Sequence, residues 1–346
     1  MTRKLARIVQ IDSVVPIDGA DSIESAKVGG WTVVVKKGEY KPGDLAVYFE
    51  IDSFLPEGKE AWKFLTDKSS RVFNNVKGHV LRSIKLRGQV SQGLLLPLRV
   101  DSLFDGFDTS HIDVDVSDIL RVTKYEPPVP AELSGIARGA FPLCVQKTDQ
   151  ERIQNLAPEL AEFVEEDYLT WEVTEKLEGS SCTFAWIEND LHVCSRNIDL
   201  LCTEGNSFWG VAKELDIQNK LTTLFFGKNL ALQGELVGPG VQGNIYSLTK
   251  RKFFLFDVYD IDRRKYMSPS EREEIAKQLG LEQVPILDKE FRIPQESPMA
   301  SLLAFADGPS QLKNTQLREG LVFKSNQRQM SFKVVSNKYL LKQSAG

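Results

Sequence analysis

Three prolines within the four residues 127–130 divide this chain more sharply than any other feature of its sequence. Proline lacks a backbone N–H and has a fixed φ, so such a run neither continues a helix nor pairs inside a sheet. At 346 residues the chain is long enough for two domains, each with its own core. We therefore predict a first domain over residues 1–125, a linker over 126–147 and a second domain over 148–346.

The segment before the prolines consists of short strand-like runs separated by glycine-rich turns. Gly29-Gly30 leads into one apolar run, and the turn-rich segment 38–44 leads into another. Several short strands with such turns predict a small all-β barrel, and we expect one of the OB type. The expected strands are 8–15, 28–35, 45–50, 80–86 and 93–98.

The segment after the linker alternates strand-like and helix-like patterns. Thr148-Asp149 has the composition of a helix start, and further helices are expected over 204–215 and 268–279. The last of these begins with Ser-Pro and is followed by glycine, which are the usual helix-boundary residues. The apolar run 253–259 predicts a buried strand. We therefore expect a mixed α+β second domain.

Composition and charge exclude several classes of protein. Hydrophobic residues make up 42% and charged residues 26%, and the net charge of −5 argues against a uniformly basic nucleic-acid coat. No apolar run approaches the roughly 20 residues of a membrane helix, and the basic N-terminus lacks the apolar core of a signal peptide. The four cysteines form no C-x-x-C pair, so we expect no zinc site. We expect a cytoplasmic protein, or one of another reducing intracellular compartment, with no membrane partner.

Lys176-Leu177-Glu178-Gly179 lies between two strand-like runs, 168–175 and 181–187. A lysine in this position suits a nucleophile at the floor of a pocket, where burial and neighbouring cations favour the neutral amine. Taken alone, the tetrapeptide is more typical of a surface turn. The motifs that follow it give it chemical meaning.

Carboxylates and lysines downstream complete a set of groups suited to nucleotide chemistry. Glu178, Glu235 and Glu319 offer oxygen ligands of the kind that hydrated Mg²⁺ prefers. Lys324 and Lys333 would supply positive charge for phosphates. With the lysine nucleophile, these groups suit attack of an amine on the α-phosphorus of a nucleotide, because they compensate the charge of the departing pyrophosphate.

The order of these motifs resembles that of the covalent nucleotidyltransferases, the superfamily of DNA ligases, RNA ligases and mRNA capping enzymes. The matching segments are Lys176-Leu-Glu-Gly179, Ser195-Arg196-Asn197, Gly234-Glu-Leu-Val-Gly238, Phe256-Asp257-Val258, Glu319-Gly-Leu-Val322 and Phe332-Lys333. Glu175 directly before the lysine, and the segment from Glu319 to Lys324, resemble RNA ligases more than DNA ligases. The β-rich module in front resembles the ATP-dependent RNA ligases that carry an N-terminal OB module. The implied fold is a ligase-type α+β nucleotidyltransferase domain preceded by an all-β OB-like barrel.

The resemblance implies roles for the motif residues, with Lys176 as the catalytic nucleophile that carries AMP. Phe256 would stack on the adenine of ATP. The full implied nucleotide-binding set is Glu175, Glu178, Gly179, Arg196, Glu235, Phe256, Glu319, Lys324 and Lys333.

The resemblance also implies a divalent metal, and it is less complete in the last motif. Glu178, Glu235 and Glu319 would hold Mg²⁺ or Mn²⁺, through water. Some family members have a second lysine in the last motif, but this chain has Val335 there. Lys338 is a candidate replacement, which the sequence does not decide.

The implied activity is ATP-dependent joining of RNA ends in three steps. The lysine takes AMP from ATP, AMP moves to an RNA 5′-phosphate, and a 3′-OH then displaces it. The partners would be RNA ends, including those of a nicked RNA or RNA/DNA duplex in RNA repair, and we expect a monomer. The alternatives are an mRNA-capping-type guanylyltransferase or DNA ligase of the same superfamily, and a non-catalytic RNA-binding protein.

One basic pattern lies in the first segment, where Arg82, Lys85 and Arg87 alternate with apolar residues. Such alternation is typical of a strand edge that faces nucleic acid, and equally of an ordinary half-exposed strand.

Overall fold

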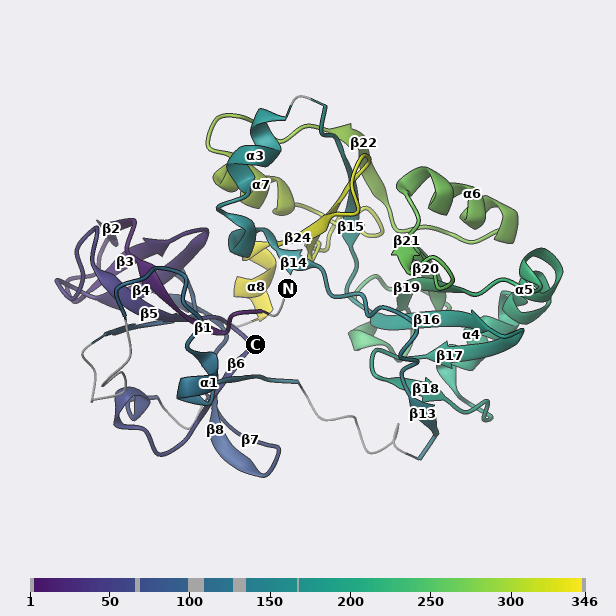
Figure 1. Cartoon of the computed structure of the whole chain (residues 1–346), viewed down its shortest axis with the longest axis horizontal. Coiled ribbons are helices and arrows are strands. Elements are labelled where there is room, and N and C mark those ends of the chain that lie inside the picture. The colour runs from purple at the N-terminus through teal and green to yellow at the C-terminus, as the bar shows by residue number, and fades with distance from the viewer. Residues whose placement is uncertain (1–2, 66–68, 99–108, 127–134, 167, 344–346) are drawn as a thin grey trace. The chain divides into compact units, whose positions relative to one another are not determined.

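The computed structural model describes residues 3–65, 69–98, 109–126, 135–166 and 168–343 (Figure 1). The chain forms two compact units, one of residues 1–128 with 340–346 and the other of residues 129–339. The prolines of 127–130 lie outside the described residues. No helix in the described ranges is both long and apolar enough to cross a membrane.

The first unit is a set of short antiparallel strands, as the sequence predicts. Its sheets have the strand orders β1-β5-β11, β2-β3-β4, β12-β6-β8-β7 and β10-β9. A 3-10 turn, η1 (Glu60–Trp62), and a short helix, α1 (Ser117–Leu120), complete it. The strands are β1 (Ala6–Gln10), β2 (Ser13–Pro16), β3 (Ile23–Val28), β4 (Trp31–Lys36), β5 (Leu45–Phe49), β6 (Ser53–Pro56), β7 (Ser70–Phe73), β8 (Val76–Val80), β9 (Ser83–Leu86), β10 (Gln89–Gln92), β11 (Leu94–Pro97) and β12 (Thr123–Lys124).

Strand β5 lies at the centre of the first unit and is buried on both faces. Successive side chains of a strand point to opposite faces. Val47 and Phe49 therefore enter one apolar cluster, while Ala46 and Tyr48 enter another. A strand packed on both faces is typical of a small closed β-architecture, which agrees with the predicted barrel.

The second unit contains two sheets. The larger has the order β13-β18-β17-β16-β19-β20-β21, and the smaller has the order β14-β24-β23-β15-β22. The strands are β13 (Ala137–Ala140), β14 (Glu151–Arg152), β15 (Trp171–Lys176), β16 (Ser180–Ile187), β17 (Asp190–Cys194), β18 (Ile198–Leu200), β19 (Leu230–Val237), β20 (Lys252–Asp260), β21 (Lys265–Tyr266), β22 (Ile286–Phe291), β23 (Gly320–Ser325) and β24 (Ser331–Val335).

Helices cover one face of each sheet. Three helices share an apolar cluster with the seven-stranded sheet: α4 (Ser207–Glu214), α5 (Ile217–Phe225) and α6 (Pro269–Leu279). Two others pack on the five-stranded sheet: α3 (Leu160–Glu165) and α7 (Pro298–Ala306). The unit also contains η3 (Ile153–Leu156) and η4 (Gln242–Asn244), and α8 (Asn337–Gln343) begins in it and continues past its last residue, 339.

The boundaries of α6 confirm the helix predicted over 268–279. The Ser268 side chain accepts a hydrogen bond from the Glu271 N–H, and the Glu271 carboxylate accepts one from the Ser268 N–H. This is a capping box. Gly280 ends the helix with φ of 61°, in the left-handed region that favours glycine.

Two expectations fail near the start of the second unit. The helix expected at Thr148-Asp149 is wrong, because residues 151–152 instead form β14, which pairs in parallel with β24. The pairing of these residues with the edge strand of a sheet outweighs the local sequence preference for a helix start. The linker expected over 126–147 does not extend over residues 137–140, since these form β13 and pair with β18.

Candidate active site

The Lys176 motif is the connection between the two sheets of the second unit. Lys176 is the last residue of β15 in the five-stranded sheet, and β16 of the seven-stranded sheet begins at residue 180. Leu177 is buried beside Tyr246, whose hydroxyl accepts a hydrogen bond from the Glu178 N–H at 2.7 Å. At Gly179 a Cβ would lie 2.4 Å from the Leu236 carbonyl oxygen on the neighbouring strand β19, so a larger residue would disturb the pairing of β16 with β19. The motif therefore places the lysine at a fixed joint.

Lys176 and Glu319 form an ion pair at this joint. The backbone of Lys176 pairs with Gly320, so the residue before β23 comes beside the lysine. Lys176 Nζ donates to Glu319 Oε1 at 2.6 Å, and the two side chains are 29% and 20% exposed. The lysine amine is therefore held by a carboxylate but remains accessible.

Glu235 lies on β19 close to this pair. Burial raises the pKa of Glu235 to about 8; the charge of Lys176 opposes this shift and that of Glu319 adds to it. The Gly179 N–H also donates to the carboxylate and lowers its pKa. Burial therefore disfavours the charged form of this carboxylate, and a nearby hard divalent cation, which prefers oxygen ligands, would favour it.

Among the side chains that the structure describes, no three His, Cys, Asp or Glu groups gather closely enough to hold a metal ion unaided. A cation bound beside Glu235 and Glu319 would therefore keep water ligands, as expected for hydrated Mg²⁺.

Arg196, in the turn between β17 and β18, and Lys333, on β24, share one acidic neighbour. Lys333 on β24 donates to Asp149 Oδ1 at 3.1 Å, and the guanidinium of Arg196 lies 3.7 Å from Asp149 Oδ2. Burial lowers the pKa of Lys333 to about 8, and the positive charge of Lys176 contributes. These cations therefore lie where an anionic ligand of the lysine would be stabilised.

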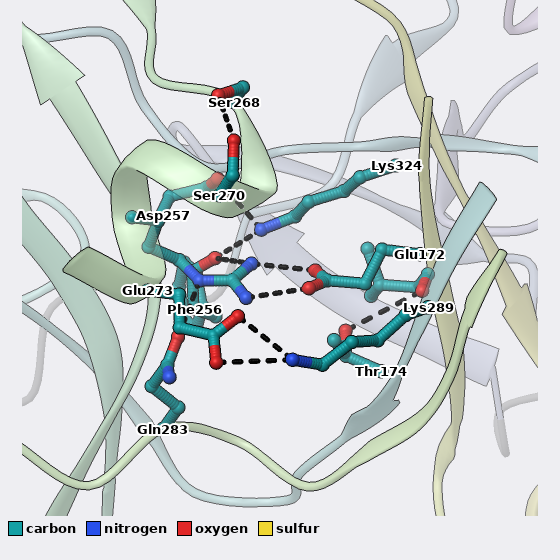
Figure 2. Close-up of polar contacts among 12 residues, drawn as sticks. Glu172, Thr174, Phe256, Asp257, Ser268, Ser270, Glu273, Gln283, Lys289 and Lys324 are labelled. Carbon is teal, nitrogen blue, oxygen red and sulfur yellow. Dashed lines mark hydrogen bonds and ion pairs between the residues drawn. The ribbon is translucent and has the colours of Figure 1, made fainter. Parts of the chain in front are cut away.

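Phe256 on β20 and Lys324 on β23 lie near Glu172, toward the end of β15 opposite to Lys176 (Figure 2). Phe256 on β20 is partly buried against the cluster that contains Leu177. Lys324 is buried, pairs with Asp257 at 2.7 Å and lies opposite Glu172 on β15. Since Glu172 precedes Lys176 by four residues, Lys324 is ~13 Å along the strand from the lysine joint.

Two further candidate residues, Glu175 and Lys338, make contacts with residues other than Lys176. The carboxylate of Glu175 accepts a hydrogen bond from the Gln311 N–H at 2.7 Å, and as the neighbour of Lys176 in a strand it points to the opposite face. Burial raises the pKa of Glu175. Lys338 is exposed in the first turn of α8, and its N–H donates to Asp307.

Sequence reasoning missed four polar residues of this region: Tyr246, Asp149, Glu172 and Arg272. Glu172 had a visible signal, because it is a charged residue inside an apolar strand and must find a buried partner. The other three had no local signal, since each acts through a neighbour distant in the sequence.

Comparisons with known proteins agree with this geometry. A family model described as an OB-fold domain matches residues 5–98, and one described as RNA ligase matches residues 169–340. No match was found among curated protein sequences.

Solved structures of the RNA ligase of Naegleria gruberi match the whole chain. A single-substitution variant with AMP and Mn is 42% identical, with a TM-score of 0.87 and coverage of 98% of each chain. Another variant, with ATP and Mn, is 43% identical, with a TM-score of 0.86 and coverage of 97% of this chain and 98% of that one. The ligase with PPi is 42% identical, covers 100% of both chains and has a TM-score of 0.86.

The predicted architecture is thereby confirmed, with an N-terminal OB-fold domain ahead of an α+β ligase domain. The guanylyltransferase, DNA ligase and non-catalytic readings are not favoured. At this identity over nearly the full length, the chain belongs to the RNA ligase family.

Proposed function

We propose that this protein is an ATP-dependent RNA ligase that joins RNA 3′-OH and 5′-phosphate ends through a lysyl-AMP and an RNA-adenylate. The observation that carries the proposal is the accessible amine of Lys176, held 2.6 Å from Glu319 at the joint of two sheets. The likeness to an RNA ligase solved with ATP, AMP and Mn supports the choice of nucleotide and metal.

In the first step, the neutral amine of Lys176 attacks the α-phosphorus of ATP. An N–P bond forms, the bond from the α-phosphorus to its bridging oxygen breaks, and pyrophosphate leaves. The amine must first lose its proton, which passes to solvent because the side chain is accessible, and the Glu319 carboxylate is placed to accept a hydrogen bond from the amine before and after this loss. In the later steps AMP passes to the RNA 5′-phosphate and is released when the 3′-OH attacks.

Glu178, Glu235 and Glu319 are proposed to hold Mg²⁺ or Mn²⁺ through water. When bound, the cation would neutralise the charge that develops on the phosphates. The raised pKa of Glu235 supports this assignment, because the charged form of a carboxylate buried away from water is favoured by a nearby cation.

Phosphate and base contacts are proposed for residues around the joint. Arg196 and Lys333 would exchange Asp149 for phosphate oxygens, and the Gly179 backbone would lie close to the nucleotide. Phe256 would stack on adenine, for which a partly exposed aromatic face is suited.

Two members of the predicted nucleotide-binding set receive indirect roles. We assign Glu175 to fixing the loop at Gln311, and Lys324 to placing Phe256, because both side chains are buried and already paired. Lys338, being exposed, stays a candidate for the second lysine of the last motif.

The N-terminal unit is proposed to contact RNA through the hairpin of β9 and β10. Arg82, Lys85 and Arg87 are exposed there, beside exposed Ile84 and Leu86. Cations on an exposed strand attract a phosphate backbone. Replacing all three with alanine should weaken RNA sealing, increasingly at higher salt, and leave self-adenylylation unchanged; unchanged sealing would remove this role.

Further proposals concern the setting of the enzyme. The substrates would be RNA ends, including those of a nicked RNA or RNA/DNA duplex in RNA repair, and the protein would act as a monomer. The four free cysteines support a reducing intracellular compartment. The domain limits are proposed at 1–125 and 148–346, with the qualification at 137–140 given above.

The test is incubation with α-labelled ATP or GTP and Mg²⁺, followed by denaturing gel electrophoresis. We expect label from ATP to remain on the denatured protein and to be released when 5′-phosphorylated RNA is added. Labelling by GTP alone would instead favour a capping-type enzyme. Absence of any covalent label would favour a non-catalytic RNA-binding protein.

A further inference from the structure

A buried polar network crosses from α6 to the strand that carries Lys176. Arg272 is 1% exposed, and its guanidinium makes a two-pronged ion pair with Glu172, at 2.7 and 2.8 Å. Arg272 Nε also donates to Gln283 Oε1 at 2.8 Å. Charged groups this deeply buried are rare unless paired, and here the pair joins a helix on one sheet to a strand of the other.

The same network ends on the backbone of Phe256. Arg272 Nη1 donates to the Phe256 carbonyl at 3.4 Å, and Lys324 Nζ donates to that carbonyl as well. Lys324 is held in turn by Asp257 at 2.7 Å and lies 5.8 Å from the centre of the Phe256 ring. Figure 2 shows Glu172, Asp257 and Lys324 pointing toward one another around this carbonyl.

This arrangement fixes position more than it adds stability. A buried ion pair seldom stabilises a fold more than well-packed apolar residues of the same size would. Its donors and acceptors are directional, however, so they accept little displacement. Glu172 and Lys176 lie on the same face of β15, four residues apart, and Phe256 lies on β20. The network therefore sets the separation between the Phe256 ring and the lysine amine.

We propose that Arg272 is a positioning residue for adenylyl transfer. Through Glu172 and the Phe256 carbonyl, it holds the aromatic platform at the distance from Lys176 that a bound adenine nucleotide requires. Arg272 does not touch the nucleotide itself. The proposal rests on the proposed function, because it assigns Phe256 to the base and Lys176 to the α-phosphorus.

The test uses a variant that removes the network but keeps the packing, the double substitution Arg272→Met with Glu172→Leu. Self-adenylylation is measured over a range of ATP concentrations, together with urea unfolding. We expect a folded protein whose KM for ATP rises about tenfold or more with a smaller change in kcat, because nucleotide binding is what the platform supplies. Sealing of RNA supplied with a 5′-adenylate should stay within about threefold of the wild type, because that step needs no ATP.

A milder variant covers the case in which the double variant does not fold. Gln283→Leu removes one hydrogen bond to Arg272 and leaves both ion pairs, and it should raise KM for ATP about two- to threefold. Lys289→Ala is the matched control, because it breaks an exposed pair with Glu273, the residue next to Arg272. KM for ATP should then equal that of the wild type.

The outcomes separate this inference from the proposed function. If the wild type takes no AMP, the proposed function and the inference both fail. If the wild type takes AMP and the folded variants show an unchanged KM for ATP, Arg272 is a structural residue only and the inference alone fails.

Discussion

The two ends of β15 carry ion pairs that differ in exposure. Glu172 and its partner Arg272 have side chains 3% and 1% exposed, whereas Lys176 and its partner Glu319 are 29% and 20% exposed. Both pairs lie on one face of the strand, four residues apart. A fully buried pair cannot exchange partners without leaving a charge unpaired, while an accessible pair can open toward a ligand. One strand therefore combines a fixed end with a reactive end.

We expect the largest effect, a loss of AMP labelling, from a change of Lys176 at the reactive end of β15. Lys176→Arg keeps the positive charge and the length of the side chain, but a guanidinium is not a nucleophile at neutral pH. We expect AMP labelling to fall below detection. Lys289→Arg, at an exposed lysine on β22, is the matched control and should label like the wild type. Labelling of the Lys176 variant at the wild-type level would contradict the role of this end.

For the free energy of unfolding, we expect the larger loss from a change at the buried end of β15. Arg272→Ala leaves the Glu172 carboxylate buried without its partner, so we expect the free energy of unfolding to fall by about 3–5 kcal/mol. Lys176→Ala should cost about 1 kcal/mol or less, because its pair is accessible to water. Urea titration of both variants measures the difference. Equal losses would show that the two ends do not differ as described.

The pH dependence of stability should reveal the burial of Glu235 near the reactive end of β15. The pKa of Glu235 rises from 4.5 to about 8 on folding, so the native state binds a proton that the unfolded state releases. The contribution of this group to stability is full below pH 4.5 and is lost as pH rises toward 8. We expect urea unfolding without metal to show a smaller loss over this range for Glu235→Gln. An unchanged pH profile would contradict the shift.

The smallest effect is expected at the surface beside the fixed end. Lys289 and Glu273 pair at 2.9 Å, but their side chains are 59% and 50% exposed. Lys289→Ala should change the free energy of unfolding by less than about 1 kcal/mol. A loss as large as that of Arg272→Ala, in the same urea assay, would mean that depth of burial does not distinguish these pairs.

Much of this molecule could be predicted from local sequence. The strands around Lys176, the buried strand of Phe256 and the capped helix α6 follow from periodicity and boundary residues. The motif order also singles out Glu235 and Glu319, which lie close to the lysine in the structure. These features depend on residue types at fixed spacing, which the sequence displays directly.

The remaining features depend on tertiary pairing. Lys324 and Lys333 were equivalent in the sequence, but the structure buries Lys324 against Asp257 and brings Lys333 to Asp149. Arg272 lies between exposed Glu271 and Glu273 in a charged helix segment, and only its tertiary pair with Glu172 distinguishes it from these neighbours. The parallel pairing of β14 with β24 likewise joins segments about 180 residues apart, which local composition does not encode.

The most direct test is to locate the covalent AMP by peptide mass spectrometry after incubation with ATP and Mg²⁺. We expect a single modified peptide, with the added AMP on Lys176 at the accessible end of β15. Acid treatment should release the AMP, because a phosphoramidate bond is acid-labile. AMP on Lys324 or on another lysine would contradict the assignment of the nucleophile, and so would the absence of any modified peptide from an active preparation.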